Sequence, residues 1–200
     1  LKKTALFREQ LRAILKVKWH SKIHIMFPMI GQLEELMESK RILEEERQKI
    51  NAPRVKIGIM IEVPSAAVMA SQFAPHVDFF SIGTNDLTQY TLAMDRGHNE
   101  LAQQVDGLHP AVLHLIEMTI KGAHQYGKWV GICGGTASEA KAIPILLGLG
   151  LDELSLSVPN IPLIKALIRK LDRRECEKVA LEALKLTNGK EVRELVGRHY

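Results

Sequence analysis

The chain has 200 residues, of which 46% are hydrophobic and 25% charged, and its formal net charge is +4 at pH 7. This composition is enough for one domain with a substantial core, and it excludes a highly charged disordered chain. Positive and negative side chains are interspersed along the predicted helices, which indicates solvated helix faces and argues against a nucleic-acid-binding protein. No apolar run approaches the roughly 20 residues that span a bilayer, so we expect no membrane insertion.

Apolar spacing predicts helices and strands in alternation along the whole chain. The first helix shows it clearly, with Leu6, Leu11, Ile14 and Leu15 at helical intervals. In chain order we expect helix 5–16, strand 22–27, helix 32–50, strand 56–61, helix 65–72, a strand that begins at 77, helices 87–94 and 111–126, strand 128–132, helix 138–147, strand 153–157, and helices 161–170, 174–186 and 190–200.

This repeated order of strand and helix predicts an α/β fold with a parallel sheet, because crossover connections between such strands are right-handed. Nearly continuous apolar strands are typical of a sheet covered on both faces. About five units fit either an open doubly wound sheet or part of an eight-stranded barrel, and in both cases ligands bind at the carboxyl ends of the strands. No glycine-rich dinucleotide signature follows any predicted strand.

The beginning of the sequence, Leu1-Lys2-Lys3-Thr4, has neither a methionine nor the apolar core of a signal peptide. We therefore expect a piece of a longer cytoplasmic protein. Its two cysteines are Cys133 and Cys176, and neither has the close partner of a zinc motif. So few cysteines also argue against a disulfide framework.

Three apolar strands end in polar residues, and these are the candidate site. The first ends at Glu62, the next at Asn85 and Asp86, and the third at Cys133. If the strands lie side by side, these groups converge at one edge of the sheet. Two carboxylates near a thiol indicate a metal site with a proton donor beside it.

Glu62 and Asp86 are hard oxygen ligands, and Mg²⁺ commonly takes one or two carboxylates while water and substrate oxygens fill its other positions. The structural alternative is that each acid caps the helix that follows it. Both interpretations stay open on spacing alone, and the position of both acids at the ends of buried strands favours the metal.

The remaining candidates have alternatives of the same kind. Asn85 can donate its amide protons to an anionic ligand or simply stand in a turn, and Arg96 can bind a carboxylate or phosphate or pair with Asp95 at the surface. Cys133, a thiol that is mostly protonated at neutral pH, can act as an acid or as a nucleophile, or can be a small core residue.

Five segments resemble one known family, the C-terminal phosphoenolpyruvate-binding domain of enzyme I of the bacterial sugar phosphotransferase system. They are GIMIEVP at 58–64, DFFSIGTNDLTQY at 78–90, DRG at 95–97, LHPA at 108–111 and GICG at 131–134. The likeness runs from about residue 8 to the final helices, and the segment 78–90 is highly specific. Pyruvate phosphate dikinase and phosphoenolpyruvate synthase belong to the same superfamily.

The resemblance implies a (β/α)₈ barrel of the TIM type, of which residues 1–200 form an incomplete part of about five units. It implies that Glu62 and Asp86 hold Mg²⁺, that Asn85, Asp86 and Arg96 bind phosphoenolpyruvate, and that Cys133 protonates the enolate to give pyruvate. It also implies a phosphoryl-accepting histidine on a separate N-terminal domain, transfer from there to the carrier protein HPr, and a homodimer formed through this domain.

Two departures from the family pattern concern this site. The family's first barrel strands, which carry two further arginines for the substrate phosphate, have no counterpart here, so we expect the chain alone to be weakly active or inactive. Gly135 stands where enzyme I usually has glutamate, and the resulting Gly-Gly pair after Cys133 resembles the fused multiphosphoryl transfer proteins. His24 stands where many relatives have arginine.

We therefore predict part of a phosphoenolpyruvate-protein phosphotransferase. Two rivals remain at this point. One is a dikinase or synthase of the same superfamily, which would need a nucleotide. The other is a non-catalytic dimerisation module that keeps the fold without turnover.

Overall fold

The computed structural model describes residues 3–17 and 23–200. Its strands are β1 (His24–Phe27), β2 (Lys56–Ile61), β3 (Phe79–Gly83), β4 (Trp129–Cys133) and β5 (Glu153–Leu154). They form one parallel sheet whose spatial order, β1-β2-β3-β4-β5, is the order of the chain. Lys22, the predicted start of the first strand, lies outside the described residues, as do Leu1 and Lys2.

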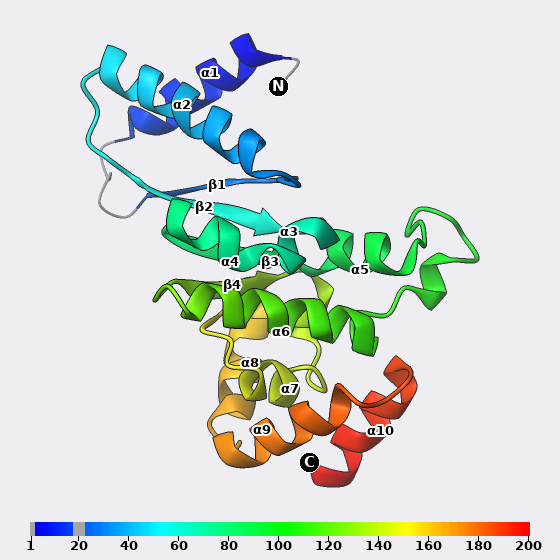
Figure 1. The fold of residues 1–200 in the computed structure, drawn as a ribbon. Helices are drawn as coiled ribbons and strands as arrows, with labels where there is room; N and C mark the ends of the chain where they lie inside the picture. The colour runs from blue at the N-terminus through cyan, green and yellow to red at the C-terminus, as the bar shows by residue number, and fades with distance from the viewer. Residues whose placement is uncertain (1–2, 18–22) are drawn as a thin grey trace.

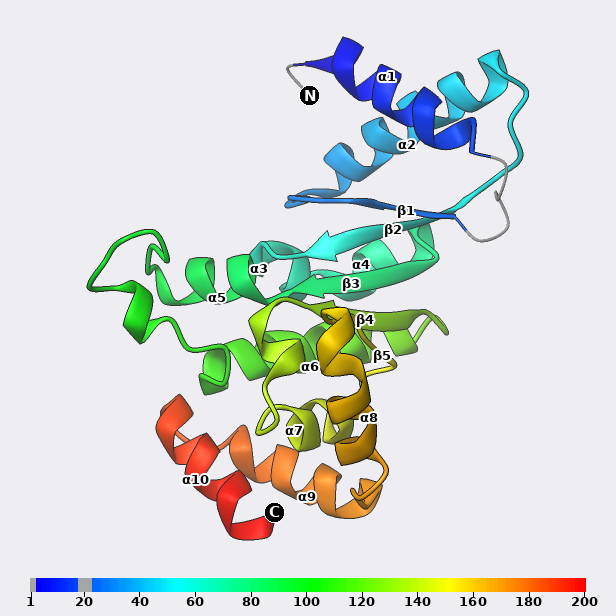
Figure 2. The same cartoon turned by 180° about the vertical axis from the view of Figure 1, so that it is seen from behind.

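The helices follow the strands in the predicted alternation (Figures 1 and 2). They are α1 (Thr4–Leu15), α2 (Leu33–Lys49), α3 (Pro64–Val68), α4 (Ala70–Phe73), α5 (Thr84–Leu92), α6 (Pro110–His124), α7 (Ile143–Gly148), α8 (Ile161–Ile168), α9 (Arg173–Ala183) and α10 (Gly189–His199). Of the described helices, none is both long and apolar enough to cross a bilayer.

The fold is an incomplete α/β barrel of five strands. A doubly wound sheet reverses its strand order at a switch point, whereas the strands here succeed one another without reversal, as they do in a barrel. In Figure 1, α3, α4 and α6 lie in front of the central strands, and the reverse view in Figure 2 shows the strands facing the viewer. Helices α1 and α2 lie at one end of the molecule and α9 and α10 at the other.

The strand face beneath the helices holds the core. Side chains at alternate positions of the central strands are 0% exposed: Ile59, Ile61, Phe80, Ile82, Val130 and Ile132. Burying each such side chain contributes roughly 1.5–3 kcal/mol, so this face accounts for much of the stability of the fold.

The other strand face carries aromatic rings, as expected for the interior of a barrel. Phe79 and Trp129 are register partners, and their rings stack with centroids 4.7 Å apart. The His24 ring lies 5.4 Å from Phe79 across Gly58, where a Cβ would approach the Phe79 ring to 2.6 Å. Glycine at this position therefore makes room for the ring.

Two helices begin elsewhere than the spacing predicted. The helix predicted at 138–147 becomes a short 3₁₀ turn followed by α7, because Pro144 lacks a backbone N–H and fits only the first turn of a helix. The helix predicted at 87–94 begins earlier, at Thr84, so that Asn85 and Asp86 lie in the first turn of α5 rather than at the tip of β3.

Two further elements are shorter than predicted. The helix predicted at 65–72 is interrupted at Met69, whose backbone ψ of 19° departs from helical geometry, and divides into α3 and α4. The last strand, predicted over 153–157, comprises only Glu153 and Leu154.

Candidate active site

The three strands predicted to end in polar residues are neighbours in the sheet. β2 pairs with β3, and β3 pairs with β4. Gly83 lies opposite Cys133, and Ile61 lies opposite Ile82. Glu62 follows Ile61 directly, so it stands level with Gly83 and Cys133 at the carboxyl edge of the sheet. The sheet thus brings together Glu62 and Cys133, while Asn85 and Asp86 follow β3 in the first turn of α5.

Glu62 is held in a fixed orientation. Glu62 is only 5% exposed, and its Oε1 accepts a hydrogen bond of 2.7 Å from the backbone N–H of Met29. Met29 has a positive φ of 53°, a backbone conformation that residues other than glycine rarely adopt. The turn after β1 therefore directs an amide at this carboxylate. Glu62 Oε2 lies beside Gly83, where a Cβ would approach it to 3.2 Å.

Asp86 and Arg96 form an ion pair. Asp86 stands in the first turn of α5, where the helix dipole favours a negative charge, and it is half-buried. Arg96 Nη2 lies 3.0 Å from its Oδ1. Asp95, the alternative partner, accepts instead from the N–H of Gly97. Arg96 therefore stands beside one of the two carboxylates.

Asn85 is oriented by a neighbouring loop. Its Oδ1 accepts a hydrogen bond of 3.1 Å from the N–H of Gly135. With the oxygen occupied, the side-chain NH₂ is the group left to donate to an anion. Gly134 permits this approach, because it has a φ of 93° and a Cβ there would lie 2.9 Å from Asn85 Oδ1. The glycines after Cys133 thus let the loop close over Asn85.

Cys133 is a half-buried free thiol. Burial raises its pKa above the ordinary value, the charges of Glu62 and Asp86 raise it further, and a hydrogen bond with Ser81 opposes them. The thiol is therefore protonated at neutral pH and suited to give a proton. Its backbone is fixed as well, since Thr84 Oγ1 donates to the Cys133 carbonyl over 2.8 Å.

The chemistry of the two acids suits a small divalent cation. Within the described part of the chain there is no group of three or more His, Cys, Asp or Glu side chains that would enclose a metal by itself. Mg²⁺ does not need one, because it binds through one or two carboxylates together with water and substrate oxygens. Glu62 and Asp86, with oxygens at one edge of the sheet, fit that mode.

Sequence reasoning missed Ser81 and Met29. Ser81 precedes Gly83 by two positions and therefore lies on the same strand face, and it contacts the Cys133 thiol. A polar residue within an apolar strand was the available signal. Met29 had no such signal, because it acts through its backbone N–H.

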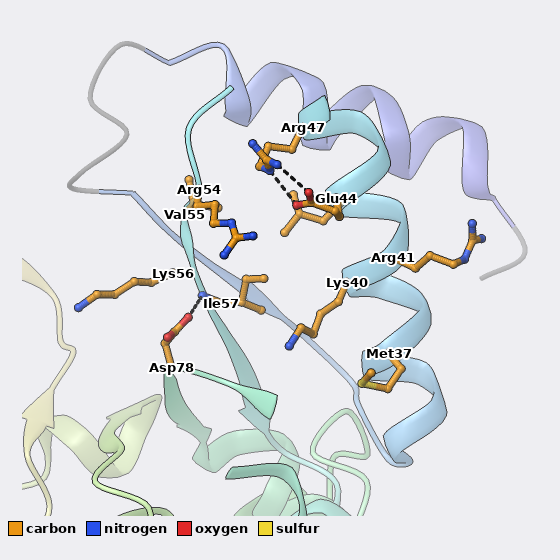
Figure 3. Close-up of a pocket in the computed structure, with 11 residues that line it drawn as sticks. Met37, Lys40, Arg41, Glu44, Arg47, Arg54, Val55, Lys56, Ile57 and Asp78 are labelled. Carbon is orange, nitrogen blue, oxygen red and sulfur yellow. Dashed lines mark hydrogen bonds and ion pairs between the residues drawn. The ribbon is translucent and has the colours of Figure 1, made fainter. Parts of the chain in front are cut away.

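A second region with charged side chains lies at the other end of the strands. A cavity of about 660 Å³ lies between α2 and the start of β2, and Figure 3 shows the side chains that line it, among them Asp78, which precedes β3. Basic residues outnumber acids in its lining; Arg47 pairs with Glu44 at 2.6 Å, and Asp78 accepts from the N–H of Ile57. The acids and thiol of the candidate site lie at the opposite edge of the sheet.

Comparison with known families gives a match over most of the chain. Residues 1–173 match the family described as PEP-utilising enzyme, PEP-binding domain. The chain is 53% identical over 190 residues to a multiphosphoryl transfer protein of Rhodobacter capsulatus, covering 95% of this chain and 23% of that protein.

Two further relatives carry the name phosphoenolpyruvate-protein phosphotransferase. The one from Listeria monocytogenes is 46% identical over 200 residues and the one from Bacillus subtilis 45% over 198 residues, with 97% and 96% of this chain covered. Each is covered over 35% of its own length. The chain therefore spans about a quarter to a third of the relatives described.

Among solved structures, a citrate lyase from Burkholderia xenovorans LB400 has a TM-score of 0.62 and 18% sequence identity. The match covers 96% of this chain and 67% of that one. At this identity the likeness concerns the fold alone.

Proposed function

This chain belongs to the family of PEP-utilising enzymes, whose PEP-binding domain it matches over residues 1–173, and on that premise we propose that it forms part of a phosphoenolpyruvate-protein phosphotransferase. Its relatives of 45–46% identity bear that name. The parent protein would transfer the phosphoryl group of phosphoenolpyruvate to a histidine on a separate domain and then to HPr. Sequence and fold make this chain the substrate-binding part.

The observation that supports this best is the position of a protonated thiol beside two carboxylates. Glu62 follows β2 and Cys133 ends β4, on the two sides of β3, and both Glu62 and Asp86 act on the thiol pKa. A metal site alone would not need an acid of this kind. A reaction that turns an enolate into a ketone does need one.

Substrate binding is assigned to Asn85 and Arg96, with Asp86. The Asn85 NH₂ would donate to the phosphate or carboxylate, and the Arg96 guanidinium would meet an anionic oxygen with paired N–H groups. Glu62 and Asp86 would hold Mg²⁺, which when bound neutralises substrate oxygens as negative charge develops. Arg96 already lies 3.0 Å from Asp86, so the cationic and acidic parts of the site adjoin.

The transfer would proceed in two events. The bond between phosphorus and the enol oxygen of the substrate breaks while a bond from phosphorus to the acceptor histidine nitrogen forms, and the electron pair remains on the enolate. Cys133 then gives its proton to the methylene carbon, which becomes the methyl group of pyruvate. Because protonation at carbon consumes the enolate, it draws the transfer forward.

The remainder of the proposal concerns the parent protein. We propose that preceding barrel strands complete the anion site, that the protein works with Mg²⁺ in the cytoplasm, and that it dimerises through this domain. Gly135 and the neighbouring Gly134, together with 53% identity to a multiphosphoryl transfer protein, favour a parent with additional fused domains.

The test is pyruvate formation from phosphoenolpyruvate by the full-length parent, with Mg²⁺, HPr and no nucleotide. We expect Cys133→Ala to lower the rate by about 10²- to 10⁴-fold, the usual contribution of a positioned general acid. Cys176→Ala is the matched control, because Cys176 is buried in α9, away from the strand ends, and should keep the wild-type rate per folded molecule.

Other outcomes would change the assignment. Turnover that requires AMP or ADP would identify a synthase or dikinase. Absence of turnover under every condition would leave a binding module. An unchanged rate in Cys133→Ala would show that Cys133 is not the acid, and the assignment as a phosphotransferase would stand.

A further inference from the structure

Arg193 of α10 connects two loops that lie 54 and 87 residues before it in the chain. Its Nε and Nη2 donate to the two carboxylate oxygens of Glu139 over 2.8 and 3.2 Å. Its Nη1 donates to Asp106 Oδ2 over 2.5 Å and to the carbonyl of Gly189. One guanidinium thus uses all of its nitrogens to hold two acids, and such a paired geometry is specific to arginine.

The two loops held by Arg193 also pack against each other. Gly107 lies so close to Thr136 that a Cβ would meet its Oγ1 at 2.2 Å. Gly189, at the start of α10, approaches Asp106 to a similar extent, with a Cβ 2.0 Å from Oδ2. A side chain on either glycine would displace the side chain of Thr136 or Asp106 from its present position. Helix α10 and both loops therefore form one closely fitted unit.

This unit adjoins the candidate site at Asn85. The loop that contains Glu139 begins with Gly134 and Gly135, and the N–H of Gly135 donates to Asn85 Oδ1. A cavity of about 190 Å³ is lined by Asn85, Gly135, Glu139 and Arg193 together with other residues of α5 and the two loops. Arg193 is therefore linked to Asn85 in three steps: its ion pair with Glu139, the 3₁₀ turn at 135–138 that precedes Glu139, and the hydrogen bond from the Gly135 N–H to Asn85.

We propose that Arg193 is a positioning residue: by holding the loops at 105–109 and 134–139 together, it keeps the Gly135 N–H on Asn85 and so directs the Asn85 NH₂ toward the substrate anion. This inference rests on the proposed function, in which Asn85 binds phosphoenolpyruvate. Helix α10 lies beyond residues 1–173 that match the family, so the contribution comes from outside the matched domain.

The first arm of the test needs no substrate. In the ligand-free chain, Arg193→Gln should speed backbone hydrogen exchange at residues 134–139 by about tenfold, because the loop loses both bonds to the guanidinium. Arg193→Lys, which keeps the charge but not the paired geometry, should give an intermediate rate and guards against a variant that does not fold. Arg198→Gln, an exposed arginine of the same helix, is the matched control and should exchange like wild type.

The second arm measures KM and kcat in the full-length parent. Arg193→Gln should raise KM for phosphoenolpyruvate by about 10- to 100-fold, the penalty of a misplaced binding group, with a smaller effect on kcat. In an Asn85→Ala background the same substitution should raise KM no further, since both changes remove one interaction. Val192→Ala, which weakens α10 packing without touching the ion pairs, should lower Tm and leave KM unchanged.

The outcomes separate the inference from the proposed function. If wild type forms no pyruvate, the proposed function fails, while hydrogen exchange still decides whether Arg193 holds the loop. If the wild type turns over, and Arg193→Gln shows the same exchange rates or the same KM as the wild type, the positioning role is overturned. A KM effect that persists in full without the Asn85 side chain overturns the route through Asn85.

Discussion

At Cys133, burial and neighbouring charge act on the pKa of the thiol in the same direction. The half-buried thiol lies near two carboxylates, and both influences raise its pKa, while Ser81 acts in the opposite direction. A thiolate would be repelled at this place, whereas a neutral S–H is accommodated. The residues around Cys133 therefore favour an acid over a nucleophile, since nucleophilic cysteines have lowered pKa values.

Alkylation measures this directly. Iodoacetamide reacts with the thiolate, so Cys133 in a Cys176→Ala background should react slowly at neutral pH, and its rate should rise only above the ordinary cysteine pKa of about 8.5. Glu62→Gln removes a charge that raises the pKa, so its rate profile should move to lower pH. Glu182→Gln, an exposed acid of α9, should leave the profile in place. A Cys133 that reacts fully at neutral pH would contradict an acid role.

At the scale of elements, α7 and α9 approach each other at a glycine. A Cβ on Gly148, the last residue of α7, would lie 2.1 Å from the Cys176 carbonyl oxygen of α9. No rotamer change relieves a clash with backbone. The two helices can keep their present spacing only with glycine at this position.

Gly148→Ala should therefore destabilise the protein by about 1–3 kcal/mol, as is usual when extra atoms enter a packed region. Gly197→Ala is the matched control, since it lies in α10 with nothing within 4 Å of its Cβ position. There the change should stabilise by about 0.5–1 kcal/mol through helix propensity. Urea unfolding measures both, and equal effects of the two substitutions would refute the packing argument.

The sequence predicted the elements better than their ends or their long-range contacts. Apolar runs indicated the parallel strands, and the polar residues that follow them indicated one edge of the sheet. Periodicity could not place the start of α5 at Thr84, because α5 follows directly on the last residue of β3, Gly83, and begins with polar residues. The ion pairs of Arg193 with Glu139 and Asp106 were out of reach, because they join residues 54 and 87 positions apart and depend on how α10 packs.

At the scale of the whole molecule, the sheet remains open. Its five strands do not close upon themselves in the described residues, and the rings of Phe79 and Trp129 stack on the face that a complete barrel would enclose. The candidate site occupies the carboxyl edge of this partial barrel. Under the proposed function, further strands of the parent protein contribute anion-binding groups to this site.

The isolated chain should accordingly turn over phosphoenolpyruvate at least about 100-fold more slowly than the full-length parent, since losing one preorganised donor to a developing charge costs about 10²- to 10³-fold. Both proteins would be assayed at the same Mg²⁺ and HPr concentrations, with circular dichroism to verify that the chain is folded. Equal rates would show that residues 1–200 contain the complete site.

Because the strands pair in the order in which the ribosome makes them, each βα unit can dock on the one before it as the polypeptide emerges. Arg193 is synthesised well after Asn85, Gly135 and Glu139. The strand-end carboxylates and the thiol would thus be assembled early on a nascent chain, while the loop that orients Asn85 is secured only after α10 has left the exit tunnel. Binding competence would therefore be acquired only after the sheet that supports it has formed.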